Sequence, residues 1–321
     1  MIPAFSAAEV LAQLPYDACI EAVRRAMIDH SAGRTRHLLR SFISMGEGRT
    51  FAQMPAALST DGWFGAKLVS VFADPRDPSH RAHRGLVVLF EGEAGEPACI
   101  ADAGAVTLIR TAAASAVATD ALARPEAAVL AILGTGRQAE AHANALPRVR
   151  NFREIVLWGR NRQRADELAG RLAETAGRRI RVAETARAAV EKADVVCTVT
   201  SAAEPILLGE WLPDGVHVNL VGSSAPGPAE VDEALVARSR FIADCREHVA
   251  NHGAEFLRAK AAGLVDDAHI AAEIGEVLAG SKPGRESGEQ VTVYKSLGHA
   301  VQDLAAVAYL YERHNARTGA P

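Results

Sequence analysis

A phosphate-binding turn is predicted by the residue types and spacing of Gly134-Thr135-Gly136-Arg137-Gln138-Ala139. Gly134 allows a sharp turn, and Gly136 has no side chain that would keep a pyrophosphate away from the backbone. Ala139 is small enough for a helix to pack closely on a strand. A helix beginning here points N–H groups and the positive end of its dipole at the phosphates. The alternative is a tight strand–helix turn without a ligand.

The residues after the next predicted strand, Arg160, Asn161 and Arg162, decide which dinucleotide such a turn would bind. An NAD-selective site usually places Asp or Glu there to bond the ribose 2′-hydroxyl, and no acid is present. A guanidinium matches a 2′-phosphate bidentately. The sequence therefore favours NADPH, with NADH possible; the alternative is that both arginines are solvated surface charges.

Three basic residues occur in apolar surroundings before this turn: Arg40, Lys67 and Arg110. Arg110 lies in Leu108-Ile109-Arg110-Thr111-Ala112, a poor place for a charge unless it binds an anion or a partner. Lys67 precedes Leu68-Val69 on a predicted buried strand. Taken singly, each is as consistent with a structural ion pair as with a ligand-binding role.

The elements that must position the turn alternate between strand and helix patterns. Strands are predicted at residues 129–133, 154–158, 180–183, 194–200, 217–221, 241–243 and 290–294, with helices between them, including 162–176. The first strand is apolar throughout, as expected for a strand buried on both faces. This alternation predicts an α/β fold with a Rossmann-type doubly wound parallel sheet.

The residues before this region alternate helices with paired strands, which predicts a second, α+β domain. Residues 74–84 are polar, basic and interrupted by proline, so we expect a mobile loop there. A last helix over residues 298–313 carries apolar side chains at helical spacing and is expected to return to the first domain. The predicted domains are residues 1–123 with 299–321, and residues 124–298.

Composition excludes several classes of function. A net charge of −4 gives no reason to expect nucleic acid or an anionic membrane as a partner. The N-terminus lacks the features of a signal peptide, and no apolar run approaches the roughly 18 residues of a membrane span. The four cysteines form no C-x-x-C pair, so we expect reduced, mostly buried thiols in a cytoplasmic protein.

No metal site is expected either. His248 and His252 have the i, i+4 spacing of some metal-binding helices, but Glu247 precedes His248, so the H-E-x-x-H pattern is absent. Two exposed helical histidines are the preferred interpretation.

Together these features resemble the ornithine cyclodeaminase/mu-crystallin family. The shared set is Arg40, Met54-Pro55, Lys67, Asp102, Arg110-Thr111-x-Ala-Ala-Ser115, Gly134-Thr135-Gly136-x-Gln138-Ala139 and Lys295-Ser296-Leu297-Gly298. The match runs in order along nearly the whole chain. It implies a nicotinamide cofactor, an amino-acid or cyclic-imine substrate, and a homodimer. It also implies that the N-terminal and C-terminal segments jointly form a substrate-binding and dimerisation domain.

The resemblance also implies roles for single residues. Arg40 and Arg110 correspond to the family's carboxylate-binding arginines, and Lys67 to its active-site lysine. The residues expected to bind the cofactor are Thr111, Gly134, Thr135, Gly136, Arg137, Gln138, Arg160, Asn161, Arg162, Thr198, Ser201, Val221, Ser296 and Leu297. Of these, the resemblance implies that Thr198, Ser201 and Val221 line the nicotinamide side and that Ser296 and Leu297 close the pocket.

Two departures from the cyclodeaminase pattern bear on the reaction. Cyclodeaminases carry Asp in a Gly-Gly-Asp-x-Pro-Gly turn, and here that position is Ser224; they carry Glu two residues before Met-Pro, and here it is Ala52. Serine is a poor base without a partner. Serine at this position is similar to the mu-crystallin-like ketimine reductases, so Ser224 is a second candidate catalytic residue.

The predicted function is therefore NAD(P)H-dependent reduction of a cyclic ketimine carboxylate of the Δ1-pyrroline-2-carboxylate or Δ1-piperideine-2-carboxylate type. Hydride would reach the imine carbon, with Lys67 as proton donor or electrostatic support and its pKa lowered toward neutrality. The alternatives are ornithine cyclodeaminase, an alanine-dehydrogenase-like amino-acid dehydrogenase, and a non-catalytic NADPH-binding protein.

Overall fold

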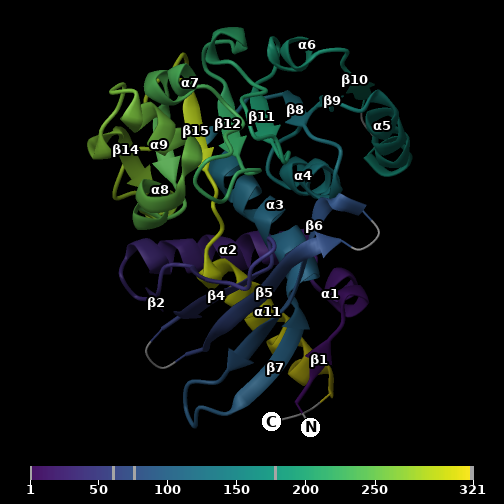
Figure 1. Cartoon of the computed structure of the whole chain (residues 1–321), viewed down its shortest axis with the longest axis vertical. Coiled ribbons are helices and arrows are strands. Elements are labelled where there is room, and N and C mark those ends of the chain that lie inside the picture. Colours follow the sequence, from purple (N-terminus) through teal and green to yellow (C-terminus); the bar gives the residue numbers. More distant parts are fainter. Residues whose placement is uncertain (1, 60–61, 75–76, 177–178, 319–321) are drawn as a thin grey trace. The chain divides into compact units, whose positions relative to one another are not determined.

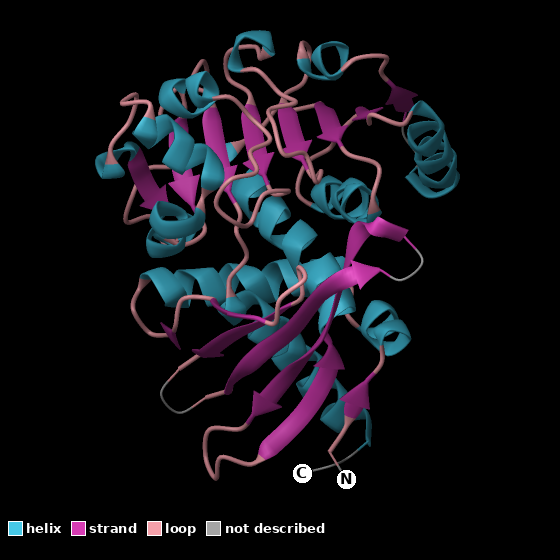
Figure 2. Cartoon of the chain, viewed as in Figure 1, coloured by secondary structure: helices cyan, strands magenta, loops and turns pink. Residues whose placement is uncertain are grey.

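A computed structural model describes residues 2–59, 62–74, 77–176 and 179–318 of the chain (Figures 1 and 2). The chain divides into unit 1, Met1–Arg110 with His299–Pro321, and unit 2, Thr111–Gly298. The first boundary therefore falls inside helix α3 (Ala103–Leu122), whereas the sequence placed it after residue 123.

The second half of α3 belongs to unit 2 because its polar side chains bond there. Ser115 Oγ lies 2.9 Å from His142 Nε2 on the following helix, and Thr119 Oγ1 accepts from Asn219 Nδ2 at 3.0 Å. Both pairs are buried. A helix is continuous by its own hydrogen bonds, so its sequence pattern does not show where its packing partners change.

Unit 1 is built on a mixed seven-stranded sheet, in the order β1-β7-β6-β5-β4-β2, with β3 also paired to β4. The strands are β1 (Ala4–Phe5), β2 (Arg36–His37), β3 (Ser41–Ser44), β4 (Thr50–Ala57), β5 (Phe64–Asp74), β6 (Asp77–Phe90) and β7 (Pro97–Asp102). Its helices are α1 (Ala7–Gln13), α2 (Tyr16–Ser31) and α11 (Ala300–Thr318), together with the first half of α3. α11 packs against α2 and the central strands, which confirms that the last helix returns to the first unit.

The prediction of a mobile loop at residues 74–84 is wrong for those residues of the segment that the structure describes, because they form strands. β5 and β6 continue through this segment as antiparallel partners, with Ala73 opposite Arg81; residues 75–76 lie outside the described part. The neighbouring strand satisfies the backbone hydrogen bonds here, and polar composition alone does not reveal that pairing.

Unit 2 contains a parallel eight-stranded sheet in its described residues, in the order β10-β9-β8-β11-β12-β15-β13-β14. The strands are β8 (Val129–Leu133), β9 (Glu154–Trp158), β10 (Arg179–Val182), β11 (Val195–Thr198), β12 (His217–Leu220), β13 (Arg240–Ala243), β14 (Ile270–Glu273) and β15 (Thr292–Lys295). The helices between them are α4 (Arg137–Ala145), α5 (Arg162–Ala176), α6 (Ala186–Val190), α7 (Glu233–Arg238), α8 (Arg246–His252), α9 (Ala254–Ala261) and α10 (Ile274–Leu278). The Rossmann-type doubly wound sheet is thus confirmed, with β14 as a strand that the sequence did not predict.

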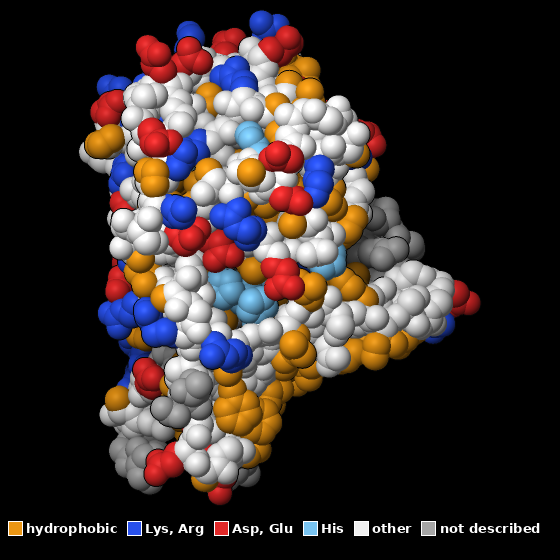
Figure 3. All heavy atoms as spheres, turned by 90° about the vertical axis from the view of Figure 1, so that its left-hand side faces the viewer, with side chains coloured by type: hydrophobic (Ala, Val, Ile, Leu, Met, Phe, Trp, Pro, Cys, Tyr) orange, Lys and Arg blue, Asp and Glu red, His pale blue; other side chains and the backbone are white. Residues whose placement is uncertain are grey.

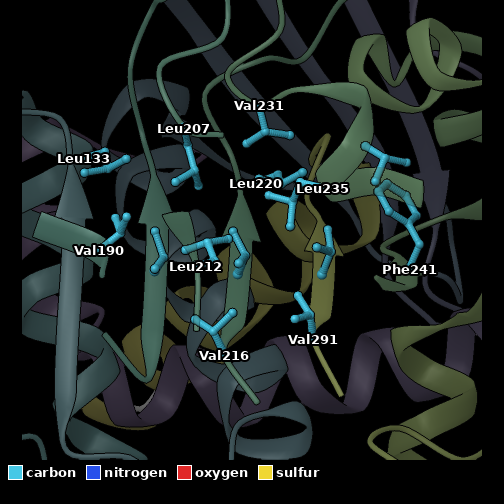
Figure 4. Close-up of a cluster of buried hydrophobic side chains, with 14 of the residues drawn as sticks. Leu133, Val190, Leu207, Leu212, Val216, Leu220, Val231, Leu235, Phe241 and Val291 are labelled. Carbon is cyan, nitrogen blue, oxygen red and sulfur yellow. The ribbon is translucent and has the colours of Figure 1, made fainter. Parts of the chain in front are cut away.

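One hydrophobic cluster in the core of unit 2 lies against one face of this sheet. Figure 4 shows Leu133, Leu220 and Val291 from the sheet region together with Leu207 and Leu235 from the covering segments in this buried cluster. The central strands are short and almost wholly apolar, as strands covered on both faces are.

His217 is a polar exception inside this sheet. Its Nδ1 lies 3.0 Å from Thr292 Oγ1, and burial lowers the pKa of His217 to about 3, so the ring is neutral.

Among the described helices, α3 alone has the length and the apolar composition that would allow a helix to cross a membrane. The sequence did not anticipate such a segment. Of its most apolar window, 78% is buried inside the protein, which is typical of a core helix.

Candidate active site

The residues predicted to bind the cofactor all belong to unit 2, and all but Thr111 follow the carboxyl ends of parallel strands. Gly134, Thr135, Gly136, Arg137 and Gln138 follow β8; Arg160, Asn161 and Arg162 follow β9; Thr198 and Ser201 are at the end of β11; Val221 follows β12; Ser296 and Leu297 follow β15. The chain winds in opposite directions from β8 and β11, and open α/β sheets bind ligands at such a point. Thr111 is buried in α3.

The glycine turn after β8 has the geometry of a phosphate cradle. Gly134 adopts φ 140°, and a Cβ there would lie 2.8 Å from the carbonyl oxygen of Val199, so a side chain is excluded. Gly136 is the N-cap of α4, makes no side-chain cap, and a Cβ on it would meet no atom within 4 Å. The open space in front of uncapped helical N–H groups fits a pyrophosphate.

The three residues after β9 differ in their availability. Arg162 Nε donates to both oxygens of Asp166 at 3.0 Å, and Asn161 Oδ1 accepts from the backbone N–H of Arg164 at 3.1 Å. Arg160 is exposed and bonds none of the residues that the structure describes. Arg160 is therefore the guanidinium best able to meet a 2′-phosphate.

The other end of the predicted cofactor site lies at β11, β12 and β15. The backbone N–H of Val221 donates to the carbonyl of Thr198 at 3.1 Å, and the N–H of Ser296 to the carbonyl of Leu220 at 3.0 Å. Ser296 Oγ is buried and has no hydrogen-bond partner among the described residues. A buried polar atom of this kind fits the amide of a nicotinamide ring. Ser201 is exposed, and Leu297 is buried.

Sequence reasoning missed Glu230, which lies beside these strand ends. Its carboxylate accepts hydrogen bonds from Thr198 Oγ1 and from the backbone N–H of Gly222, each at 2.7 Å. No local sequence signal marks it, because Glu230 precedes a short helix on an ordinary-looking loop.

Unit 1 brings Lys67 and Arg110 to one carboxylate, that of Asp303. Arg110 Nε donates to Asp303 Oδ1 at 2.9 Å, and Lys67 Nζ lies 3.3 Å from the same oxygen. Lys67 also donates to Thr107 Oγ1 at 2.6 Å. The side chains of Lys67 and Arg110 are 7% and 4% exposed, and that of Asp303 is wholly buried, so these charges are little screened by water.

Burial is the largest influence on Lys67 and lowers its pKa to about 8. The carboxylate of Asp303 opposes this shift, whereas the positive charges of Arg110 and then Arg40 add to it. Arg40, half-buried just before β3, is thus near enough to affect Lys67. Lys67 and Arg110 share the single carboxylate of Asp303, and the positive charge in excess at this pair suits an anionic ligand.

Arg110 keeps part of its guanidinium for such a ligand. Its Nε bonds Asp303, and its Nη1 donates to Gln302 Oε1 at 3.0 Å. Nη2 bonds no residue in the described part of the chain and can donate to a carboxylate.

Asp303 was also missed by sequence reasoning, although a signal existed. It is an acid in the first turn of α11, a helix whose positions Val301, Leu304 and Val307 are apolar and buried. Asp102, in contrast, has a structural role: its Oδ1 accepts from the N–H of Ala105 at 2.7 Å and caps α3.

Ser224 lies in the exposed loop after β12, between two anchored points. The carbonyl of Ser223 accepts from Lys295 Nζ at 2.7 Å, and the carbonyl of Gly227 accepts from Arg258 Nη2 at 2.6 Å.

One further expectation is wrong: His248 is buried, not exposed, because α8 packs on α9 and β14; His252 is half-buried. The four cysteines lie in the described part and are free and buried, as predicted.

Comparison with known proteins gives close relatives over most of the chain. Ketimine reductase mu-crystallin of Mus musculus is 36% identical over 275 residues, which cover 85% of this chain and 84% of that protein. Delta(1)-pyrroline-2-carboxylate reductase of Bacillus cereus is 34% identical over 296 residues, which cover 92% and 91%.

Solved structures agree with this fold over its full length. Thermococcus litoralis Delta(1)-pyrroline-2-carboxylate reductase in complex with NADH and L-proline gives a TM-score of 0.93 at 29% identity, covering 99% of this chain and 98% of that one. An archaeal alanine dehydrogenase dimer with bound NAD gives 0.92 at 28% identity, covering 99% and 97%.

The model of the ornithine cyclodeaminase/mu-crystallin family matches residues 4–318. The glycine turn, the Arg110–Lys67 cluster and this match point to the same conclusion. The chain belongs to the ornithine cyclodeaminase/mu-crystallin family.

Proposed function

We propose that this protein is an NAD(P)H-dependent oxidoreductase that reduces cyclic ketimine carboxylates such as Δ1-pyrroline-2-carboxylate and Δ1-piperideine-2-carboxylate. The observation that carries the proposal is Lys67, a buried lysine with a pKa of about 8 beside Arg110. Such a group can give a proton near neutral pH, and the adjacent arginine can hold a carboxylate. The relatives named for reduction of ketimines and of pyrroline-2-carboxylate support the same reaction.

In this proposal the substrate carboxylate binds the arginines, and the imine nitrogen meets Lys67. Arg110 presents Nη2 while Asp303 and Gln302 hold the rest of its guanidinium, so the fork is oriented before the substrate arrives. Arg40 adds a second cation for the carboxylate. Lys67 Nζ donates its proton to the imine nitrogen as the carbon accepts hydride. The nicotinamide, when bound, supplies that hydride.

Ornithine cyclodeaminase is the less favoured alternative because two acids of the cyclodeaminase pattern are absent. Their positions are Ser224, in an exposed loop, and Ala52, which is buried on β4. Without them the chain lacks the base and the anion that a second, cationic amine would need. Oxidative amino-acid dehydrogenation and non-catalytic NADPH binding are further alternatives that a substrate panel separates.

For the cofactor we propose NADPH in preference to NADH. The support is that Arg160 is exposed and uncommitted among the described residues, and that no acid follows β9 at residues 159–162. A guanidinium binds a 2′-phosphate and has no special affinity for a 2′-hydroxyl.

We also propose a homodimer formed through unit 1. All four residues of β3 are exposed, including Phe42 and Ile43, which are 51% and 56% accessible. Figure 3 shows hydrophobic side chains gathered on the lower part of one face, in unit 1. Exposed apolar groups at this density are typical of an interface. The four free, buried cysteines suit a reducing compartment, so the proposed location is the cytoplasm.

The experiment that tests this proposal is an assay of a panel of substrates with NADPH and with NADH. The reaction is monitored through the absorbance of the reduced nicotinamide. We expect consumption of NADPH with both cyclic ketimines. Formation of proline and ammonia from ornithine would support the cyclodeaminase instead, and reduction of an oxo acid with ammonia the dehydrogenase. Tight NADPH binding without turnover of any imine would contradict the proposal and favour a binding protein.

A further inference from the structure

The carboxylate of Glu230 joins the ends of two neighbouring strands in unit 2. Oε2 accepts hydrogen bonds from the hydroxyl of Thr198, which is the last residue of β11, and from the N–H of Gly222, which lies just after β12. Oε1 accepts from both the N–H and the hydroxyl of Thr200. Each of these distances is 2.7 Å, and Glu230 is fully buried. Such short bonds to a buried carboxylate are strong and directional.

The backbone at Gly222 is shaped around this carboxylate. A Cβ at Gly222 would lie 2.2 Å from the carbonyl oxygen of Thr200 and 2.5 Å from the carboxyl carbon of Glu230, distances that real side chains do not allow. Glycine at this position therefore permits the close approach of Glu230 to the N–H that it accepts.

A second layer of buried charge supports Glu230 from behind. Its backbone N–H donates to Glu255 Oε1 at 3.3 Å, and Glu255 Oε2 forms an ion pair with Lys295 Nζ at 2.8 Å. Lys295 in turn donates to the carbonyl of Ser223 at 2.7 Å. Glu255 and Lys295 are almost completely buried. The loop after β12 is consequently held at two successive residues, by Glu230 and by Lys295, immediately before Ser224.

The groups that Glu230 holds are those expected beside the reactive ring of the cofactor. Thr198 and Val221 are predicted to line the nicotinamide side, and the N–H of Val221 bonds the carbonyl of Thr198. A shift of about 1 Å in such positioning groups can cost roughly a hundredfold in rate.

We propose that Glu230 is a positioning residue for hydride transfer: through Thr198, Thr200 and Gly222 it fixes the strand ends against which the nicotinamide lies. The expected effect on kcat rests on the proposed function. The effect on the backbone at the strand ends does not, because it can be measured in the protein without cofactor or substrate. Both side-chain oxygens must be able to accept, because each receives one backbone N–H and one threonine hydroxyl. Glutamine keeps the shape but replaces one acceptor oxygen with a donor.

The test compares Glu230→Gln with Asp232→Asn as a matched control. Asp232 lies two residues away and also accepts two backbone bonds. The N–H of Leu235, at 3.2 Å, caps α7, and the N–H of Gly209, at 2.9 Å, begins the short 3-10 turn Gly209–Trp211. Hydrogen exchange of the cofactor-free proteins should show faster exchange at residues 198–202 and 222–227 in Glu230→Gln only.

The kinetic measurement uses Δ1-pyrroline-2-carboxylate with NADPH and with NADPH deuterated at the transferred position. In Glu230→Gln we expect kcat to fall roughly 10- to 100-fold with a larger deuterium isotope effect, since misplacement slows the chemical step. The KM for the ketimine should change by less than about threefold, because the carboxylate-binding arginines are untouched. Asp232→Asn should keep the wild-type kcat and isotope effect.

Unchanged exchange in Glu230→Gln, or equal loss of kcat in both variants, would overturn the inference. If Glu230→Gln does not fold, Thr200→Val removes one hydroxyl from Oε1. The same hydroxyl accepts the N–H of Ala202, so residues 222–227 decide: exchange should rise there, and wild-type exchange at those residues would again contradict the inference. A wild-type enzyme inactive on every ketimine counts against the proposed function alone, since the exchange comparison then still decides the role of Glu230.

Discussion

At Lys67, two opposing effects decide the charge of a single side chain. Burial favours the neutral amine, and the carboxylate of Asp303 favours the ammonium, which leaves the pKa at about 8. Arg110 shares the same carboxylate oxygen, so a substrate carboxylate at Arg110 and a proton on Lys67 are linked electrostatically. The predictions at this scale concern charge.

The first prediction is a pH dependence of ketimine reduction. As a proton donor, Lys67 is competent below its pKa, so kcat/KM should fall as pH rises through about 8. Lys67→Ala should lower kcat at least about a hundredfold, with the dissociation constant of NADPH nearly unchanged. A pH–rate profile and a fluorescence titration measure these two quantities. A variant with wild-type activity would remove Lys67 from the mechanism.

The second prediction concerns Asp303, whose charge raises the pKa of Lys67. Asp303→Asn should move the alkaline limb of the kcat/KM profile to lower pH, because the ammonium loses its stabilising anion. Gln302→Leu is the control: it removes a neutral partner of Arg110, so it should weaken substrate binding with no displacement of that limb. Coincident pH profiles for wild type and Asp303→Asn would show that the pair does not set the proton donor.

The third prediction tests the cofactor preference. Arg160→Ser should raise the KM for NADPH roughly 10- to 100-fold, since a charge-assisted hydrogen bond contributes about 1.5–3 kcal/mol. The KM for NADH should change little. Arg162→Ser should have the smaller effect because Arg162 already bonds Asp166. Equal KM values for NADPH in wild type and Arg160→Ser would contradict the assignment.

At the scale of single elements, the carboxyl ends of the parallel strands position the predicted cofactor-binding residues. Apart from Thr111, the predicted cofactor residues lie at the carboxyl ends of five parallel strands, on the same edge of the sheet. The glycine turn connects β8 to α4. α3 joins the two units: Arg110 in its middle belongs to the cation cluster, whereas Ser115 bonds His142 on α4. Burial lowers the pKa of His142 to about 4, so this contact is made by a neutral ring.

The fourth prediction belongs to the helix N-terminus. Gly136→Ala adds a methyl group to open space, so the protein should keep its stability within about 0.5 kcal/mol. The same methyl group would occupy the cradle, and affinity for NADPH should fall at least about tenfold. Gly170→Ala, on α5, is the control, since its Cβ also meets no atom and lies outside the turn. Thermal melts and fluorescence titrations of both variants measure the difference; undiminished NADPH affinity in Gly136→Ala would rule out the cradle.

At the scale of the whole molecule, the chemistry is divided between two compact units. Unit 1 contains Lys67, Arg110 and the exposed strand β3, and unit 2 contains the residues predicted to bind the cofactor. The return of α11 to unit 1 matters directly, because α11 supplies Asp303. An oligomer would cover apolar side chains that a monomer leaves in water.

The fifth prediction is that Ile43→Asp converts the proposed dimer to a monomer at micromolar concentration, because a buried charge opposes association. Leu264→Asp places the same charge at a similarly exposed apolar position in unit 2 and should leave the dimer intact. Sedimentation velocity distinguishes the two states. Dimers of unchanged stability in Ile43→Asp would locate the interface elsewhere.

Local features of this protein were predictable from sequence because they depend on neighbouring residues. The glycine turn, the apolar strand before it and the helix α5 follow from short-range periodicity and turn chemistry, and α5 begins and ends where predicted. The burial of Lys67 was also expected from its apolar strand, and its pKa was expected to fall if it lay near two arginines; burial is the largest cause of the lowered pKa, and Arg110 and Arg40 add to it.

Tertiary structure alone decided which distant groups meet. Arg110 and Asp303 are 193 residues apart, and the return of α11 brings them within hydrogen-bond distance. β15 inserts between β12 and β13, which places Lys295 behind the loop that Glu230 holds. Strand order and side-chain pairing across a sheet depend on long-range packing, which leaves no period in the sequence. The glycine turn could therefore be predicted from the sequence, and the buried carboxylates of Glu230 and Asp303 could not.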